Sequence, residues 1–290
     1  MNLAMLSRRN LVIAAGAASI AHPVAAAPSL MTRGYAMGPY GQIHYRDAVR
    51  GTPLVMMHQA NNSSRQFERV YPLLIAAGLR PIGIDLPGYG NSDPPDAPPT
   101  VEGWAGIIAP VLDALRIDRA NIFGHHTGST VATEFSLQHP ERTVKLLIHG
   151  AYLVTPDERA AWLKPLDTRQ TGPVYNTDGS HLSSGFLAPS ARDVDPEILT
   201  RYAVDRSLMR VPQWWGIAAV FNYDQEAALK KVRHPTLLLG NTGDQIYDLT
   251  LRARKLRPDF TYVELQGGTI HIQDEQPEAW TAAIIRYLET

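Results

Sequence analysis

The sequence predicts an α/β fold in which a mainly parallel sheet is flanked by helices. Two observations support this prediction. Short apolar runs of strand length alternate with segments of helical spacing along most of the 290 residues, and such alternation builds βαβ units with parallel strands. The alternation stops between residues 152 and 232 and then resumes, which predicts an insertion in one sheet domain.

Each element follows from a local pattern. Two extended runs between residues 35 and 48 flank a Gly-Pro-Tyr-Gly turn, which predicts a hairpin. Apolar runs predict buried strands at residues 53–57, 81–85, 121–123, 145–150, 235–240 and 261–265. Helical spacing predicts helices at residues 64–78, 101–117, 129–138, 249–256 and 277–288.

The insertion at residues 152–232 has its own composition. Turn-forming residues come first, at Pro165, Gly172, Pro173, Gly179 and Gly185, and aromatic-bearing helical patches follow, with Tyr202, Trp214, Trp215, Phe221 and Tyr223. Since loops of this length seldom lack a role, we expect a mostly helical cap on a core formed by residues 33–151 and 233–290. The alternative is that this segment is a long connection that only packs against the core.

The first 27 residues have the pattern of an export signal. Residues 7–12 read Ser-Arg-Arg-Asn-Leu-Val, a twin-arginine motif, and a short apolar segment and an Ala-Ala-Ala cleavage site follow. The apolar segment is well below the ~20 residues that a membrane span needs, so we expect no stable membrane anchor. The precursor is predicted to bind the twin-arginine (Tat) export machinery, and the mature protein to be periplasmic or secreted.

Charge and cysteine content exclude several classes of function. The formal net charge of −1 gives no basic surface, so we expect no nucleic-acid partner. The absence of cysteine excludes thiol catalysis and thiolate metal sites, and it fits export of an already folded protein that needs no disulfide.

Residues 124–128, Gly-His-His-Thr-Gly, have the spacing of a nucleophile elbow, a tight strand–turn–helix connection. Glycine is needed at both flanks because a Cβ there would collide with neighbouring backbone. The centre usually holds serine, and sometimes aspartate or cysteine. Here it holds His126, and the functional interpretation depends on this substitution.

Three segments together resemble the α/β-hydrolase superfamily, in its cap-bearing branch of epoxide hydrolases, haloalkane dehalogenases and carbon–carbon bond hydrolases. Residues 85–92, Asp-Leu-Pro-Gly-Tyr-Gly-Asn-Ser, are similar to the family's D-x-P-G-x-G-x-S turn, and residues 273–278 resemble its ending near the catalytic histidine. The elbow is the third segment. The resemblance covers residues 33–290 and implies the α/β-hydrolase fold and a cofactor-independent hydrolase of a small, partly apolar substrate.

The resemblance also implies site residues. The backbone N–H groups of Ala60 and Thr127 correspond to the oxyanion-hole donors. Gln59 replaces a usual glycine and adds an amide that could donate to a substrate oxygen. His125 is either a substrate contact or a packing residue. His58, like His44 and His149, is interpreted as structural.

The acid and base positions come from the end of the chain. Asp244 matches the family acid well, with Asp248 as the weaker candidate. His271 lies one residue later than the family histidine, whose position aligns with Ile270. A one-residue shift in the loop would place His271 in the site; without it, His126 is the only imidazole there.

Several chemistries are open to His126. As a neutral imidazole at a helix start it could activate water against an ester or lactone, attack a carbonyl as a nucleophile, or move a substrate proton in a lyase or isomerase. A non-catalytic ligand-binding protein is the rival from another class. Because His125 and His126 are adjacent, we expect their side chains to diverge, and we expect no metal site.

Overall fold

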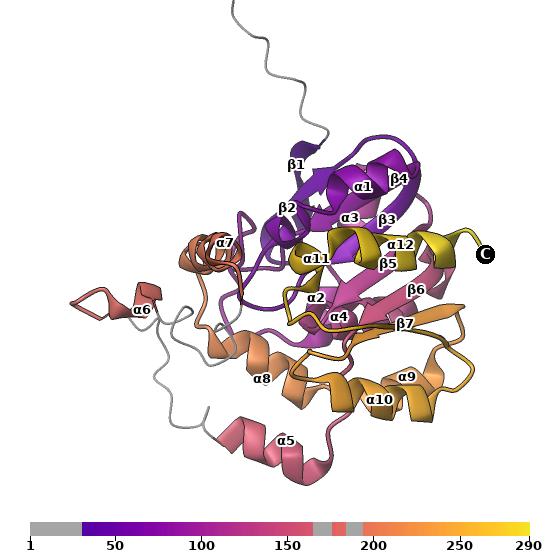
Figure 1. Cartoon of the computed structure of the whole chain (residues 1–290). Helices are drawn as coiled ribbons and strands as arrows, with labels where there is room; N and C mark the ends of the chain where they lie inside the picture. Colours follow the sequence, from indigo (N-terminus) through magenta and orange to yellow (C-terminus); the bar gives the residue numbers. More distant parts are fainter. Residues whose placement is uncertain (1–30, 165–175, 184–193) are drawn as a thin grey trace, which may run out of the picture.

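The computed structural model describes residues 31–164, 176–183 and 194–290. One eight-stranded sheet has the order β1-β2-β4-β3-β5-β6-β7-β8, and the strands from β3 onward are parallel to one another (Figure 1). The strands are β1 Thr32–Gly38, β2 Gly41–Asp47, β3 Thr52–Met57, β4 Leu79–Ile84, β5 Ala120–His125, β6 Thr143–His149, β7 Thr236–Asn241 and β8 Thr261–Leu265. The predicted α/β fold with a mainly parallel sheet is confirmed.

Helices connect the strands and cover both faces of the sheet. They are η1 Ser64–Phe67, α1 Tyr71–Ala76, α2 Val101–Ala105, α3 Ile108–Ala114, α4 Thr127–Gln138, η2 Pro140–Arg142, α10 Tyr247–Leu256, α11 Ile272–Glu275 and α12 Pro277–Leu288. Two helices predicted as continuous are each broken in two. Pro72, in the first turn of α1, lacks the N–H that a helix continuing from η1 would need, and Gly106 ends α2.

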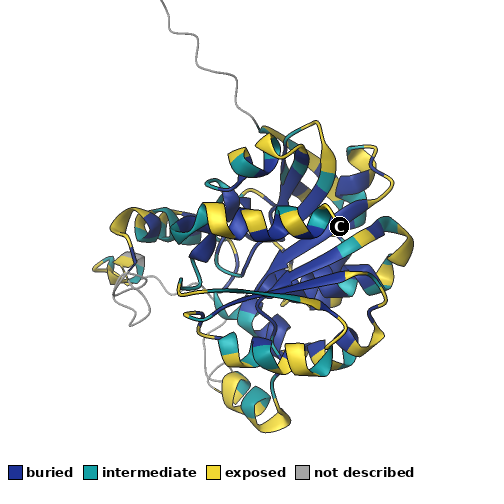
Figure 2. Ribbon diagram, turned by 45° about the vertical axis from the view of Figure 1, so that its right-hand side comes forward, coloured by how far each residue is buried: buried dark blue, intermediate teal, exposed yellow. Residues whose placement is uncertain are grey.

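The core consists of two apolar layers, one on each face of the sheet. Val55 and Met57 of β3 point into the layer covered by α2, α3 and α4, whereas Leu54 and Met56 point into the layer that contains Phe67 and Trp280. Successive side chains of a strand point to opposite faces, so fully apolar strands fill both layers. Figure 2 shows the buried residues concentrated in the sheet and on the inner sides of the helices.

The segment between β6 and β7, called here the β6–β7 insertion (residues 150–235), carries α5 Pro156–Leu163, α6 Ser180–Ser183, α7 Pro196–Ser207, α8 Trp214–Asn222 and α9 Gln225–Lys231. Its helix α8 packs on the loop after β3, since a Cβ added at Gly216 would lie 2.7 Å from the Ala60 Cβ. The predicted signal segment 1–27 and Pro165, Gly172, Pro173 and Gly185 lie outside the described residues. Within the described ranges, no helix has the length and apolar character for a membrane span.

Candidate active site

The elbow places His126 where β5 meets α4. His126 has φ 50° and ψ −113°, a strained combination for a residue with a side chain, and α4 begins at Thr127. A Cβ at Gly124 would collide with the Gly128 carbonyl, and a Cβ at Gly128 with the Met57 carbonyl. Both flanking glycines are therefore required by the close approach of backbone segments, as the sequence predicts.

Asp244 and Tyr152 contact the two nitrogens of His126. The Asp244 Oδ2 lies 2.7 Å from His126 Nε2, and the Tyr152 hydroxyl lies 3.3 Å from His126 Nδ1. Both His126 and Asp244 are buried, at 1% and 8% exposure. Asp244 follows β7 and Tyr152 follows β6, so the ends of neighbouring parallel strands bring the three side chains together.

The ionisation of Asp244 determines which atom carries the proton in its hydrogen bond with His126. Burial raises the pKa of Asp244, but the charge and hydrogen bond of His126 lower it more, so the pKa lies below its ordinary value. Asp244 is therefore ionised at neutral pH and only accepts hydrogen bonds. In the neutral imidazole of His126, the ring proton consequently lies on Nε2, and Nδ1 has a lone pair that faces the Tyr152 hydroxyl.

Three imidazoles are packed side by side behind the elbow. The ring centroids of His125 and His126 are 4.6 Å apart, as are those of His125 and His149. The expectation that the side chains of His125 and His126 diverge is wrong, because the positive φ at His126 turns its ring back beside that of its neighbour. His149 is held by Trp280 Nε1, 3.0 Å from its Nδ1, and by Asn241 Oδ1, 3.0 Å from its Nε2.

The predicted oxyanion loop follows β3. His58 Nδ1 donates to the Gln59 carbonyl at 2.7 Å, and its Nε2 accepts from the Leu86 N–H at 2.9 Å, so His58 braces this loop as predicted. Among the described residues, neither the Ala60 N–H nor the Thr127 N–H has a hydrogen-bond acceptor. Both donors are thus free to bind an oxygen of a ligand.

Several buried polar atoms near the elbow also lack a partner within the described part of the chain. They are Gln59 Oε1, Asn61 Oδ1, His125 Nε2 and His271 Nδ1. Gln66 connects two of these residues, because its Oε1 accepts from the Gln59 N–H at 3.0 Å and its amide nitrogen contacts His125 Nδ1. An unpaired buried polar atom costs about 1–3 kcal/mol, so such a group favours a polar ligand or water.

His271 lies beside the site but does not enter the His126–Asp244 contact. Its ring packs on Tyr202 with centroids 4.1 Å apart, and its backbone N–H donates to Thr269 Oγ1. Burial, with a smaller contribution from the nearby His126, lowers the pKa of His271 to about 4, although Glu275 acts to raise it. Of the three predicted catalytic residues, the structure thus joins His126 to Asp244 and leaves His271 without a bond to either.

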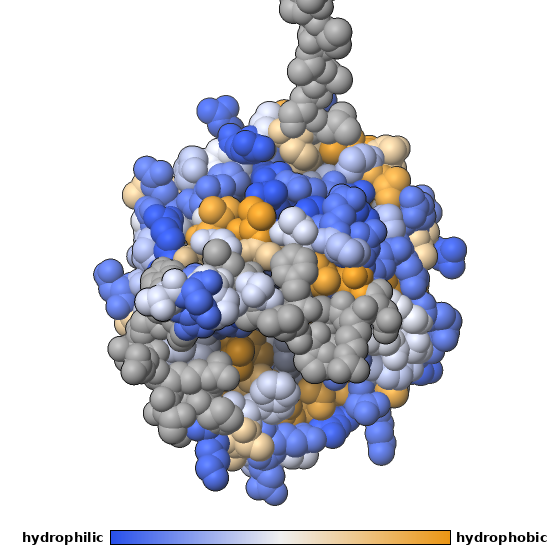
Figure 3. Space-filling view, turned by 60° about the vertical axis from the view of Figure 1, so that its left-hand side comes forward, coloured by the Kyte–Doolittle hydropathy of each residue, from blue (hydrophilic) through white to orange (hydrophobic). Residues whose placement is uncertain are grey.

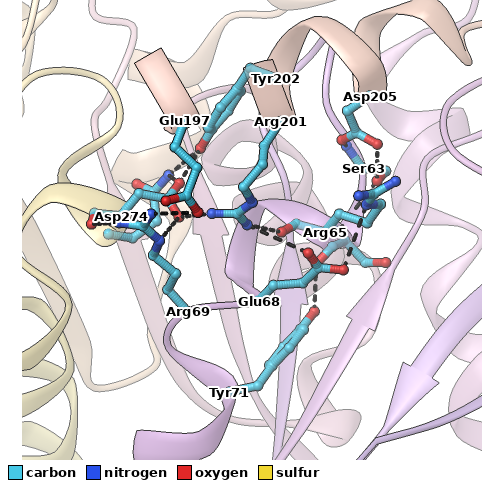
Figure 4. Close-up of polar contacts among 12 residues, drawn as sticks. Ser63, Arg65, Glu68, Arg69, Tyr71, Glu197, Arg201, Tyr202, Asp205 and Asp274 are labelled. Atoms are coloured by element: carbon cyan, nitrogen blue, oxygen red, sulfur yellow. Dashed lines mark hydrogen bonds and ion pairs between the residues drawn. The ribbon is translucent and has the colours of Figure 1, made fainter. Parts of the chain in front are cut away.

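Helix α7 of the insertion is bound to the core by polar contacts next to the site (Figure 4). Arg201 Nη1 lies 2.7 Å from Asp274 Oδ1, and both the N–H and the hydroxyl of Ser63 donate to Asp205, at 2.6 and 2.7 Å. A cavity with room for about one water molecule lies among these contacts. It is lined by Arg65, Gln66, Arg201, Tyr202 and Asp205.

Sequence reasoning missed Tyr152. A signal was present, since Tyr152 comes three residues after the end of the strand next to the elbow strand, and ligand sites of α/β sheets lie beyond the carboxyl ends of such strands. Among the described residues, no three histidine, aspartate or glutamate side chains come together as they would around a metal ion.

Comparison with known proteins connects this geometry to one family. Residues 52–270 match the family described as having the alpha/beta hydrolase fold. The chain is 28% identical over 207 residues to a poly(3-hydroxyalkanoate) depolymerase of Ectopseudomonas oleovorans, covering 68% of this chain and 70% of that protein. It is 32% identical over 217 residues to a 2-hydroxymuconate semialdehyde hydrolase of Pseudomonas sp. (strain CF600), covering 70% and 74%.

A solved structure shows the same fold over most of the chain. The thermophilic esterase from Thermogutta terrifontis superposes with a TM-score of 0.71 at 20% sequence identity, covering 89% of this chain and 98% of the esterase. At this identity the likeness concerns the fold alone.

Proposed function

The chain belongs to the α/β-hydrolase fold family and is a hydrolase, and on that premise we propose that it cleaves a small, partly apolar ester or lactone with His126 as general base. The observation that carries this proposal is the 2.7 Å contact between Asp244 Oδ2 and His126 Nε2. An acid partner on one nitrogen of an imidazole makes the other nitrogen a base, whereas apolar packing would leave the ring inert.

The reaction uses water directly. His126 Nδ1 accepts a proton from a water molecule as its oxygen attacks the substrate carbonyl, and the ionised Asp244 stabilises the imidazolium that forms. The free N–H groups of Ala60 and Thr127 bind the oxygen on which negative charge develops, an effect worth about 3 kcal/mol for each donor. The proton then returns to the leaving oxygen, so no covalent intermediate is required.

The substrate class follows from the site's two kinds of lining. Tyr152, Phe221 and Trp162 form an aromatic series, with Tyr152 and Phe221 centroids 5.6 Å apart and Phe221 and Trp162 centroids 4.8 Å apart. Figure 3 shows hydrophobic residues in a hollow on the insertion side of the molecule. An apolar acyl or alkyl group suits these surroundings, and the ester carbonyl suits the free N–H groups.

The mature protein is further proposed to act outside the cytoplasm. The twin-arginine motif at Arg8 and Arg9 and the absence of cysteine support this. Replacement of both arginines by lysine is expected to retain the protein in the cytoplasm, which fractionation of the producing cells would reveal; unchanged export would contradict the proposal.

The test of the catalytic proposal measures hydrolysis of p-nitrophenyl butyrate by the wild type and by His126→Ala. We expect kcat to fall roughly 10³-fold in the variant, since general base catalysis is lost. A serine-directed fluorophosphonate should leave the wild type unlabelled. Turnover within about threefold of wild type in His126→Ala, or labelling of any serine, would remove His126 from the mechanism. Tight binding of an ester without turnover would identify a binding protein instead.

A further inference from the structure

Tyr152, His126 and Asp244 form a hydroxyl–imidazole–carboxylate series. The Tyr152 hydroxyl lies 3.3 Å from His126 Nδ1, and His126 Nε2 lies 2.7 Å from Asp244 Oδ2. The planes of the two rings are nearly perpendicular, at 89°. A hydroxyl, an imidazole and a carboxylate in this order form a path for one proton along two hydrogen bonds.

The direction of these hydrogen bonds is set from the carboxylate end. Asp244 can only accept, so Nε2 carries a ring proton, and in the neutral imidazole that acts as the base Nδ1 accepts. The Tyr152 hydroxyl is therefore the donor to Nδ1. Burial raises the pKa of Tyr152, and the charge of Asp244 raises it further, so the phenol keeps its proton at neutral pH. In the resting site Tyr152 is a proton donor already bonded to the base.

Tyr152 is also the least buried residue of the series. His126 and Asp244 are buried, whereas Tyr152 remains partly exposed. Its position is fixed, because its N–H donates to Gln225 Oε1 at 2.6 Å and its ring packs edge-on against Phe221. The Tyr152 hydroxyl contacts the ring nitrogen that Asp244 leaves free, so a proton that reaches His126 Nδ1 can pass along this hydrogen bond.

We propose that Tyr152 is a further catalytic residue, whose hydroxyl transfers protons between His126 Nδ1 and the reacting oxygens. The inference rests on the proposed function of His126. In the first step a water O–H bond breaks, the proton joins Tyr152 Oη, the Tyr152 proton joins His126 Nδ1, and the hydroxide bonds to the ester carbon. In the second step the ester C–O bond breaks, the leaving oxygen takes the Tyr152 proton, and Tyr152 regains a proton from His126.

The test compares two butyrate esters that differ in the leaving group. p-Nitrophenolate leaves without protonation, whereas the ethoxide of ethyl butyrate needs a proton as it leaves. For Tyr152→Phe, which keeps the ring, we expect kcat to fall about 10-fold on p-nitrophenyl butyrate and about 10²–10³-fold on ethyl butyrate, with KM changed less than about threefold.

A second tyrosine serves as the matched control. Tyr223 is buried, follows α8, and its hydroxyl donates to Glu134 Oε2 at 2.8 Å, away from His126. Tyr223→Phe therefore removes one buried tyrosine hydrogen bond and should leave kcat on both esters unchanged. Thermal unfolding of both variants checks that each is folded.

The outcomes separate this inference from the proposed function. Equal losses on the two esters in Tyr152→Phe would make Tyr152 a positioning residue and overturn the inference, as would wild-type kcat on ethyl butyrate. Both results leave the function of His126 intact if His126→Ala is inactive. If the wild type hydrolyses neither ester, or if His126→Ala remains active, the proposed function fails, and the inference fails with it.

Discussion

The described residues contain two buried histidine–aspartate pairs, and we propose one of them as a base. His44 Nδ1 lies 2.8 Å from Asp85 Oδ2, and His126 Nε2 lies 2.7 Å from Asp244 Oδ2. All four side chains are almost fully buried. By residue type, distance and burial the two pairs are equivalent, so these features alone do not identify a catalytic group.

The surroundings of the pairs differ. Asp85 also accepts from the N–H groups of Ser64, at 2.7 Å, and Asn91, at 3.0 Å, and His44 sits on the regular strand β2. This pair fixes the turn at residues 85–93. Asp244 accepts one further hydrogen bond from the described residues, from the Ile246 N–H, and its histidine stands at the strained elbow with Nδ1 facing the Tyr152 hydroxyl. The position at the elbow and the contact of the second nitrogen with the Tyr152 hydroxyl are therefore the features that make His126 the candidate base.

The largest expected difference between the two pairs is in the effects of replacing Asp244 and Asp85 by asparagine. Asp244→Asn keeps the shape but removes the charge that stabilises the imidazolium, so kcat on p-nitrophenyl butyrate should fall roughly 10²–10⁴-fold. Asp85→Asn places an amide against backbone N–H donors and should lower the free energy of unfolding by about 3 kcal/mol, with kcat of the folded protein within about fivefold of wild type.

Urea unfolding and initial rates measured on the same preparations test this contrast. Similar kcat values for Asp244→Asn and wild type would show that both pairs are structural. A kcat loss in Asp85→Asn as large as in Asp244→Asn, measured on folded protein, would show that the distinction between the pairs is wrong.

His149 extends the comparison to a buried histidine whose hydrogen-bond partners, Trp280 and Asn241, are neutral. Burial, with a smaller contribution from His126, lowers its pKa to about 4, although Asp244 and the Asn241 hydrogen bond act to raise it. Between pH 6.5 and 4 the unfolded chain binds a proton at this histidine and the folded chain does not, so stability falls as pH falls. From pH 7 to 4.5 this loss is about 2–3 kcal/mol.

Urea unfolding of the wild type and His149→Gln at these two pH values measures that loss. The glutamine variant cannot titrate, so its free energy of unfolding should fall by about 2–3 kcal/mol less than that of the wild type. Asp85 and Asp244 behave differently. Burial raises the pKa of each, but the paired histidine lowers it more. Their stabilisation is therefore lost only below about pH 4, as pH falls through the folded pKa values. Equal losses of unfolding free energy in the wild type and in His149→Gln would contradict the assignment of this pH dependence to His149.

The sequence shows which positions carry the site but not how the side chains meet. Glycine spacing places His126 at the elbow, and the end of a strand places Asp244 near it, because both follow from local backbone pattern. The contact of Tyr152 with His126 and the position of His271 depend on loop register and on ring rotations set by tertiary packing. The packing of the His125 ring beside the His126 ring depends on one positive φ angle, for which the residue type gives no signal.

The position of the His126 ring depends on the absence of a side chain at Gly150. Gly150 has φ +73°, and a Cβ there would lie 2.7 Å from His126 Cδ2 and 3.0 Å from Ile246 Cδ1. Gly150→Ala should displace the ring from Asp244, lowering kcat about 10-fold and stability by about 1–3 kcal/mol.

Gly78 is the matched control for Gly150, since its φ is +78° and a Cβ added there meets no atom within 4 Å. Gly78→Ala should carry the backbone cost of about 1 kcal/mol without a change in kcat. Equal kcat values for the two alanine variants would show that the Gly150 position does not set the geometry of His126.

The smallest effect is expected at His271, a third kind of histidine in this comparison. No carboxylate of the described residues binds it, because the Glu275 carboxylate binds the N–H and hydroxyl of Thr269, at 2.6 and 2.7 Å. Asp244 already binds His126, so the loop that carries His271 adds no base. His271→Gln should therefore change kcat on p-nitrophenyl butyrate less than about threefold. If substrate binding transferred Asp244 from His126 to His271, this variant would lose as much activity as Asp244→Asn, and His126 would no longer be the base of the reaction.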